Sequence, residues 1–84
     1  MKIIIVGAGV VGEELCAELS AGDNDVILIE QDIEKIERII EKYDITGLVG
    51  NGASHENLIE AGIENTDMFI SVTESDELNI MACV

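Results

Sequence analysis

A glycine pattern at residues 7–12, GAGVVG, constrains the fold of this chain more than any other feature of its sequence. It directly follows an uninterrupted aliphatic run at residues 3–6 and leads into residues 11–19, where Val or Leu recurs every four residues between glutamates. The aliphatic run is typical of a strand that is covered on both faces, and the recurrence is typical of an amphipathic helix. The sequence therefore predicts a strand, a tight glycine turn and a helix that ends near Gly22.

The same alternation of aliphatic runs and amphipathic segments continues along the chain. Residues 26–29 form a second aliphatic run, which Glu30 closes, and Asp32 is placed to cap the helix that follows. We expect one side of this helix to carry the apolar side chains Ile33, Ile36, Ile40 and Tyr43. Residues 46–49 and 68–72 predict a third and a fourth strand.

Two further helices are expected, one after each of these later strands. Ser54 is placed to cap the first of them, and Ser75 to cap the second. Asp76 and Glu77 would then oppose the positive end of the helix dipole in the first turn of the second helix. The apolar pattern of that helix reaches Val84 without a stop signal, so we expect the chain to end inside it.

Strands that alternate with helices through short connections predict an α/β fold with right-handed crossovers. Numbered in chain order, the four strands would lie in the order 3-2-1-4 in one parallel sheet, with helices on both faces, as in a Rossmann-like fold. We expect residues 1–84 to be the N-terminal part of a single domain of this type, truncated in the helix after strand four.

The charge of the chain argues against two classes of partner. The formal net charge is −14, and residues 43–84 carry 8 acidic and no basic side chains. Nucleic acid and anionic lipid both require clustered Lys and Arg, so neither is an expected partner. We interpret the charge itself as a matter of solubility alone, or of adaptation to a salty cell interior.

The cysteines and the N-terminal segment argue against a metal-binding protein and against a membrane-inserted one. Cys16 and Cys83 fall in apolar patterns without CxxC spacing or a nearby His, so we interpret both as small buried side chains in a reducing, cytosolic protein, with no metal site. The apolar stretch after Lys2 is too short to span a membrane, so no direct membrane insertion is expected.

The glycine pattern, placed between a strand and a helix, predicts a dinucleotide site. Gly7 would make the tight turn, Gly9 would let the backbone approach a pyrophosphate, and Gly12 would let the helix pack closely on the strand. Because the free N–H groups at the start of a helix already attract an anion, the site needs no Arg or Lys.

Glu30 ends the second strand, where a carboxylate can accept hydrogen bonds from the hydroxyl groups of an adenosine ribose. The same charge would repel a 2′-phosphate, and neither Glu30 nor Gln31 has an Arg nearby in the sequence to bind one, so NAD is favoured over NADP. The alternative is that Glu30 is a solvated charge at a strand end.

Other candidate residues follow the third and fourth strands. Asn51 lies where it can face an adenine edge, although a flexible glycine turn explains it equally well. Thr73 and Glu74 would lie near the pyrophosphate or the second ribose, or would only precede a helix cap. His55 has no partner placed by any motif, so we interpret it as a surface residue at a helix start.

Several stretches resemble the TrkA-type regulators of potassium uptake, whose domains are also called RCK, KTN or TrkA-N domains. They are MKIIIVGAGVVG, VILIE, GNGAS and especially AGIENTDMFISVTESDELNIMAC, and together the resemblance covers the whole chain. It implies a site in which phosphates, ribose, adenine and nicotinamide have separate contacts. The cofactor-binding residues are then Gly7, Ala8, Gly9, Val10, Val11, Gly12, Glu30, Gln31, Asn51, Ala53, Thr73 and Glu74.

The resemblance also implies a function and its partners. It implies a cytosolic, non-enzymatic subunit, peripheral to the inner face of the cell membrane, that binds NAD(H), or ATP or ADP, and gates a membrane potassium transporter or channel. Members of this family form dimers or rings. Some relatives have Arg where this chain has Val10, a difference that favours NAD over ATP. The alternative interpretation is the cofactor-binding half of an NAD-dependent oxidoreductase.

Overall fold

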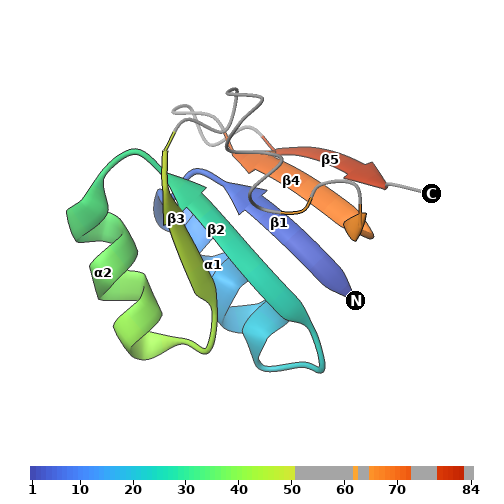
Figure 1. Ribbon diagram of the computed structural model, residues 1–84, viewed down its shortest axis with the longest axis horizontal. Helices are drawn as coiled ribbons and strands as arrows, with labels where there is room; N and C mark the ends of the chain where they lie inside the picture. The colour runs from blue at the N-terminus through green and yellow to red at the C-terminus, as the bar shows by residue number, and fades with distance from the viewer. Residues whose placement is uncertain (51–61, 63–64, 73–77, 83–84) are drawn as a thin grey trace.

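The structure, a computed structural model, describes residues 1–50, 62, 65–72 and 78–82. Strands and helices alternate through its first half, and strands alone follow among the described residues of the second half (Figure 1). The elements are β1 (Lys2–Val6), α1 (Val10–Ser20), β2 (Asp25–Glu30), α2 (Ile33–Lys42), β3 (Thr46–Val49), β4 (Met68–Val72) and β5 (Leu78–Ala82).

The strands form one sheet in the order β3-β2-β1-β4-β5. The first four strands are parallel, so the predicted order 3-2-1-4 is confirmed. In the register, Ile4 of the central strand β1 pairs with Ile27 on one side and Phe69 on the other. All carboxyl ends of the parallel strands therefore lie at one edge of the sheet, which we call the carboxyl edge.

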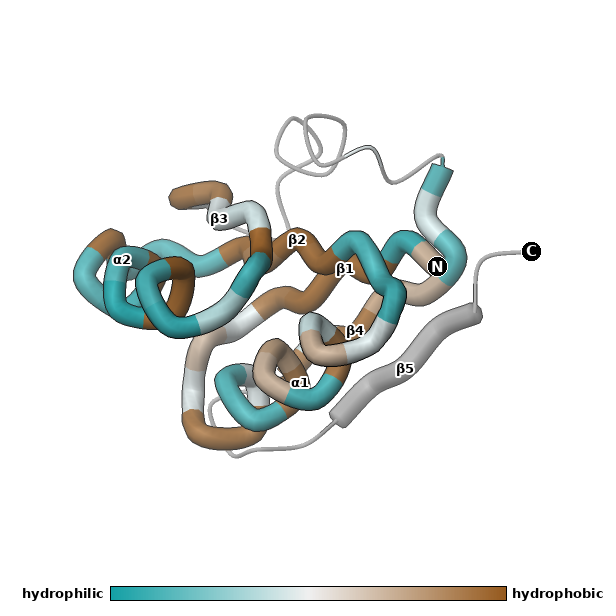
Figure 2. The backbone as a smooth tube through the Cα atoms, turned by 90° about the horizontal axis from the view of Figure 1, so that it is seen from below, coloured by the Kyte–Doolittle hydropathy of each residue, from teal (hydrophilic) through white to brown (hydrophobic). Residues whose placement is uncertain are grey.

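One face of the sheet packs against both α1 and α2. Its core includes Ile3, Leu28 and Ile70 from the strands and Cys16 and Ile39 from the helices, all nearly inaccessible to water. Figure 2 shows the helices on the same side of β1 and β2, with hydrophobic colours concentrated in the strands. This face supports the expected Rossmann-like arrangement, in which the first two crossovers lie on the same side.

The opposite face of the sheet has its own apolar cluster, made of Ile4, Ile27, Ile29 and Phe69. Burial on both faces explains why these strands are uninterrupted aliphatic runs and do not alternate with polar residues. The helix that the sequence predicts from Ser54 would belong to this face by the right-handed crossover rule, and it falls outside the described residues.

The apolar side of α2 is only partly buried. Ile36 and Ile39 are buried, whereas Ile33 is 54% exposed and Ile40 is 40% exposed. The reason is the position of α2 above the outermost parallel strand β3, where Gly47 lies directly beneath Ile36. One flank of the helix therefore extends past the edge of the sheet, and sequence periodicity does not reveal where a sheet ends.

The predicted helix after the fourth strand is wrong. Residues Leu78–Ala82 form the strand β5, which pairs antiparallel with β4 in a register that joins Val72 to Leu78 and Met68 to Ala82. A short apolar run fits a strand as well as a helix, and the outer edge of β4 would otherwise leave a row of backbone N–H and C=O groups unpaired. Pairing of that edge favours the strand.

Candidate functional site

The glycine turn between β1 and α1 lies at the carboxyl edge, as the sequence predicts. Gly7 has a φ of +104°, a left-handed conformation that favours glycine. A Cβ atom at Gly7 would lie 2.6 Å from the carbonyl oxygen of Val72 at the end of β4. The turn is therefore tight, as predicted, and it lies directly against the end of β4.

Gly12 and Gly9 meet different requirements. A Cβ atom at Gly12 would lie 2.1 Å from the carbonyl oxygen of Gly7, so this glycine lets α1 pack closely against the turn that follows β1, where the prediction was close packing on the strand itself. Gly9 has φ −73° and ψ −170°, an extended conformation that any residue adopts. The backbone conformation therefore does not explain the glycine at position 9, which leaves close approach of a ligand as its expected role.

The first turn of α1 has backbone amides without an acceptor in the helix. Gly9 is the N-cap residue and has no side chain to cap the first turn, and none of the described side chains caps it either. The first intrahelical bond is the one that the Glu13 N–H donates to the carbonyl of Gly9, at 2.9 Å. The amides of Val10, Val11 and Gly12 precede it and so have no acceptor within the helix, and Val10 is 72% exposed. These amides and the helix dipole favour negative charge.

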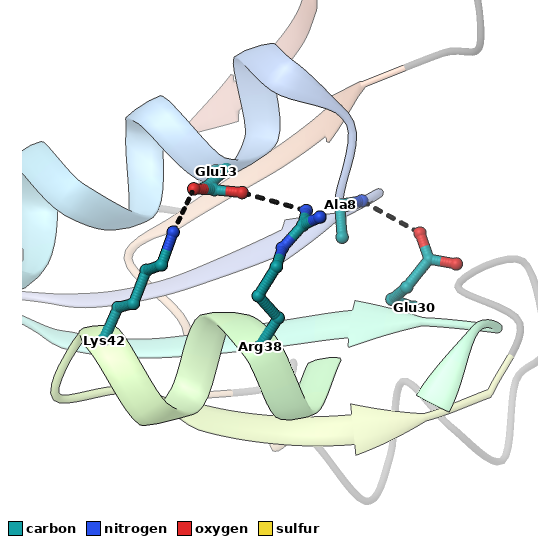
Figure 3. A network of polar contacts seen from close by, with 5 residues as sticks. All are labelled: Ala8, Glu13, Glu30, Arg38 and Lys42. Atoms are coloured by element: carbon teal, nitrogen blue, oxygen red, sulfur yellow. Dashed lines mark hydrogen bonds and ion pairs between the residues drawn. The ribbon is translucent and has the colours of Figure 1, made fainter. Parts of the chain in front are cut away.

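The carboxylate of Glu30 lies beside this turn (Figure 3). Its Oε1 accepts a hydrogen bond from the Ala8 N–H at 2.9 Å, and its Oε2 accepts one from the Asp32 N–H at 2.8 Å. Glu30 thus joins the glycine turn to the start of α2. Each oxygen retains a lone pair for a further donor. The contact also means that the Ala8 amide points towards Glu30 and is already paired, which the sequence alone does not reveal.

The end of β3 completes the described part of the edge. The Gly50 N–H donates to the carbonyl of Glu30 at 2.9 Å, and Val49 is 52% exposed. Gln31, between Glu30 and α2, is exposed. Four further residues expected at the site, and His55, lie outside the described residues; the four are Asn51, Ala53, Thr73 and Glu74.

An ion-pair cluster joins α1 and α2 at the surface. Glu13 binds Arg38 at 3.0 Å and Lys42 at 3.7 Å, so one carboxylate of α1 holds two cations of α2 (Figure 3). Both cations are more than half exposed, so the pairs contribute little stability. The sequence analysis missed this cluster, although the spacing of Arg38 and Lys42 by four residues is a signal that both lie on one face of α2.

Asp67 also has a role that the sequence analysis missed. Its carboxylate accepts a hydrogen bond from the backbone N–H of Lys2 at 2.7 Å, and its own N–H donates to the Lys2 carbonyl at 2.9 Å. These bonds fix the start of β4 to the start of β1, at the edge opposite the glycine turn. An open hollow at that edge is lined in part by Asp25, Asp44 and Asp67. It therefore lies away from the candidate site.

Cys16 is a buried structural side chain, as predicted. Burial, with a smaller contribution from the Glu13 carboxylate, raises the pKa of its thiol from 9.0 to about 11. The thiol therefore stays protonated and unreactive at neutral pH. Cys83 lies outside the described residues. Within the described ranges, no group of three His, Cys, Asp or Glu side chains is arranged to hold a metal, and neither helix is long and apolar enough to cross a membrane.

Comparison with known proteins places the chain among its relatives. The sequence model of the TrkA-N domain matches residues 3–84. The chain is 40% identical, over 83 residues, to the Trk system potassium uptake protein TrkA of Haemophilus influenzae, an alignment that covers 99% of this chain and 18% of that protein. It is 43% identical, over 82 residues, to the TrkA homolog of Archaeoglobus fulgidus, with coverage of 98% and 18%.

A third relative, the Trk system potassium uptake protein TrkA homolog 1 of Methanosarcina mazei, is 39% identical over 84 residues, which is 100% of this chain and 18% of that protein. The chain therefore spans about a fifth of the length of these curated relatives.

Proposed function

The chain belongs to the TrkA-N domain family, and from that premise we propose that it is the nucleotide-binding part of a cytosolic regulatory subunit in a potassium uptake system. NAD(H), or an adenine nucleotide, would bind at the carboxyl edge of the sheet. Its partner would be a membrane potassium transporter or channel subunit, which would hold the protein at the inner face of the cell membrane.

One observation carries this proposal: α1 begins without a side-chain cap, and a carboxylate lies beside it. The amides of residues 10–12 would hold the pyrophosphate, because they have no acceptor within the helix. Glu30 would accept the ribose hydroxyl groups through the lone pairs that its bonds to Ala8 and Asp32 leave free. A helix start that follows β1 and a carboxylate at the end of β2 match the phosphate and ribose contacts of the adenosine half of NAD in a Rossmann-type site.

The side chains at the turn favour NAD over ATP. Val10, at the first helical position, carries no charge, so no guanidinium at this position would bind a γ-phosphate. A ligand with two phosphates, held by backbone amides, therefore matches the described residues better than one with three.

Control of transport would come from unequal binding to two conformations of the assembled protein, a dimer or a ring. A ligand changes a conformational equilibrium only through its difference in affinity for the two states. A fully effective switch needs a difference of about 5.5 kcal/mol, which several subunits would share. This role needs no catalytic group.

Isothermal titration of the full natural polypeptide with NADH, NAD+, ADP and ATP tests the binding step. We expect saturable binding, with NADH tighter than ATP. Binding of neither NADH nor ADP at millimolar concentration would contradict the proposal. Potassium uptake by cells that carry the Gly9→Val variant, which blocks the ligand but leaves the backbone unstrained, tests the regulatory step. If uptake in that variant responds to the nucleotide as it does in the unsubstituted protein, nucleotide control through this site is ruled out.

A further inference from the structure

Asp32 lies in contact with the carboxylate that would bind the ribose. Its backbone N–H donates to Oε2 of Glu30 at 2.8 Å, and its own Oδ1 accepts from the Glu34 N–H at 3.0 Å as the N-cap of α2. Asp32 is exposed. The carboxylates of Glu30 and Asp32 therefore lie two residues apart in the connection between β2 and α2, at the carboxyl edge. The proposed function uses only that of Glu30.

The start of α2 would otherwise attract an anion. A helix N-terminus favours negative charge, and a 2′-phosphate on a ribose held by Glu30 would lie next to this one. In this chain, the carboxylates of Glu30 and Asp32 already accept from the amides there, and Glu34 adds a further acidic side chain in the first turn. The start of α2 is therefore already paired with carboxylates of the protein itself, and it attracts a phosphate less than an uncapped helix would.

We propose that Asp32 is a second specificity-determining residue, which excludes adenine nucleotides phosphorylated at the ribose 2′ position. The inference rests on the proposed nucleotide site. A 2′-phosphate carries about two negative charges at neutral pH and would meet the charge of Asp32 in addition to that of Glu30. Substitution of Glu30 changes structure as well as charge, because Glu30 also holds the amides of Ala8 and Asp32 in place, so Asp32 is tested by its own variants.

The variant Asp32→Asn tests the charge of this side chain apart from its structural role. Asn caps a helix about as well as Asp, so the cap on the Glu34 amide is retained while the charge is lost. Asp32→Ser is a second variant that also keeps the cap. The matched control is Glu41→Gln, which removes one exposed acidic charge near the far end of the same helix, about 13 Å along its axis.

The experiment titrates the full natural polypeptide with two pairs of probes, NADH with NADPH and AMP with adenosine 2′,5′-bisphosphate. In Asp32→Asn and Asp32→Ser we expect affinity for the 2′-phosphorylated member to rise about tenfold relative to its partner at low ionic strength, and less at high salt. Glu41→Gln should change that ratio less than about twofold.

The outcomes separate this inference from the proposed function. If NADH and AMP bind all variants but the ratio stays unchanged in Asp32→Asn, Asp32 does not read the 2′ position and the inference is wrong. An equal change in Glu41→Gln would attribute the effect to net charge and would also overturn it. If no probe binds the unsubstituted protein, the nucleotide site itself is wrong, and the inference with it.

Discussion

The two helices begin at the same edge of the sheet and cover the same face, yet their first turns are opposite in character. The first turn of α1 has Gly9 as its N-cap residue and no side-chain acceptor, whereas the side chain of Asp32 caps α2. An uncapped helix start leaves backbone donors free, and this one lies at the surface beside Glu30. This difference favours α1 over α2 as the anion site of the proposed function, because the side chain of Asp32 caps α2 and the N-cap residue of α1 has no side chain to do so.

The largest expected effect comes from closing the space between α1 and its turn. Gly12→Ala would place a Cβ atom 2.1 Å from the Gly7 carbonyl oxygen, and a backbone atom yields little. We expect the free energy of unfolding to fall by about 3 kcal/mol, measured by chemical denaturation. The control is Gly9→Ala, whose extended backbone accepts a side chain and which should fold normally. Equal stability of the two variants would show that α1 does not depend on this close contact.

Gly9→Asp would give α1 the same type of start as α2. The new carboxylate can cap the first turn, so we expect stability to rise by a few tenths of a kcal/mol. Nucleotide affinity should fall on the order of a hundredfold, about 2.8 kcal/mol, because the cap fills and charges the phosphate position. Gly9→Val should block binding without the stabilisation. Unchanged NADH affinity in calorimetry for either variant would remove Gly9 from the site.

Changes at Glu30 test the link between the two helix starts. Glu30→Ala leaves the amides of Ala8 and Asp32 without this acceptor, so we expect unfolding to cost about 1–2 kcal/mol less. NADH should bind about tenfold more weakly, with relaxed rejection of NADPH. Glu30→Gln has one acceptor oxygen instead of two and should lie between Glu30→Ala and the unsubstituted protein in stability. An equal loss of NADH and NADPH affinity would show that Glu30 does not read the ribose.

The smallest expected effect is at the cap of α2. Asp32→Ala should lower the free energy of unfolding by about 1 kcal/mol, because the Glu34 amide loses its acceptor. Asp32→Asn should keep nearly all of that stability, and NADH affinity should stay within about twofold in both variants. Thermal unfolding followed by circular dichroism gives the first comparison. A similar loss of stability in Asp32→Asn would mean that charge, and not capping, stabilises this end of α2.

Sequence patterns predicted the features that depend on neighbouring residues. The strands β1 to β4, both helices, the cap at Asp32 and the tight turn at Gly7 were all predicted and are confirmed. Each depends on local periodicity, on capping chemistry or on the backbone freedom of glycine, which a short window of sequence contains. The position of Glu30 at the end of β2 was predictable for the same reason.

Other features required contacts between distant segments. The strand β5 exists because the edge of β4 offers a partner, and the exposure of Ile40 depends on where the sheet ends beneath α2. The bonds from Asp67 to Lys2 and from Glu13 to Arg38 join residues that are 65 and 25 positions apart. No local pattern encodes such pairings.

The sequence by itself thus determined that the N-cap residue of α1 has no side chain to accept a hydrogen bond, because position 9 is glycine. Tertiary structure alone decided that Glu30 joins the two helix starts, since its contact with Ala8 exists only when β1 and β2 pair side by side in register. Local sequence therefore determines the backbone conformation and capping of each segment, and strand pairing determines which segments come into contact.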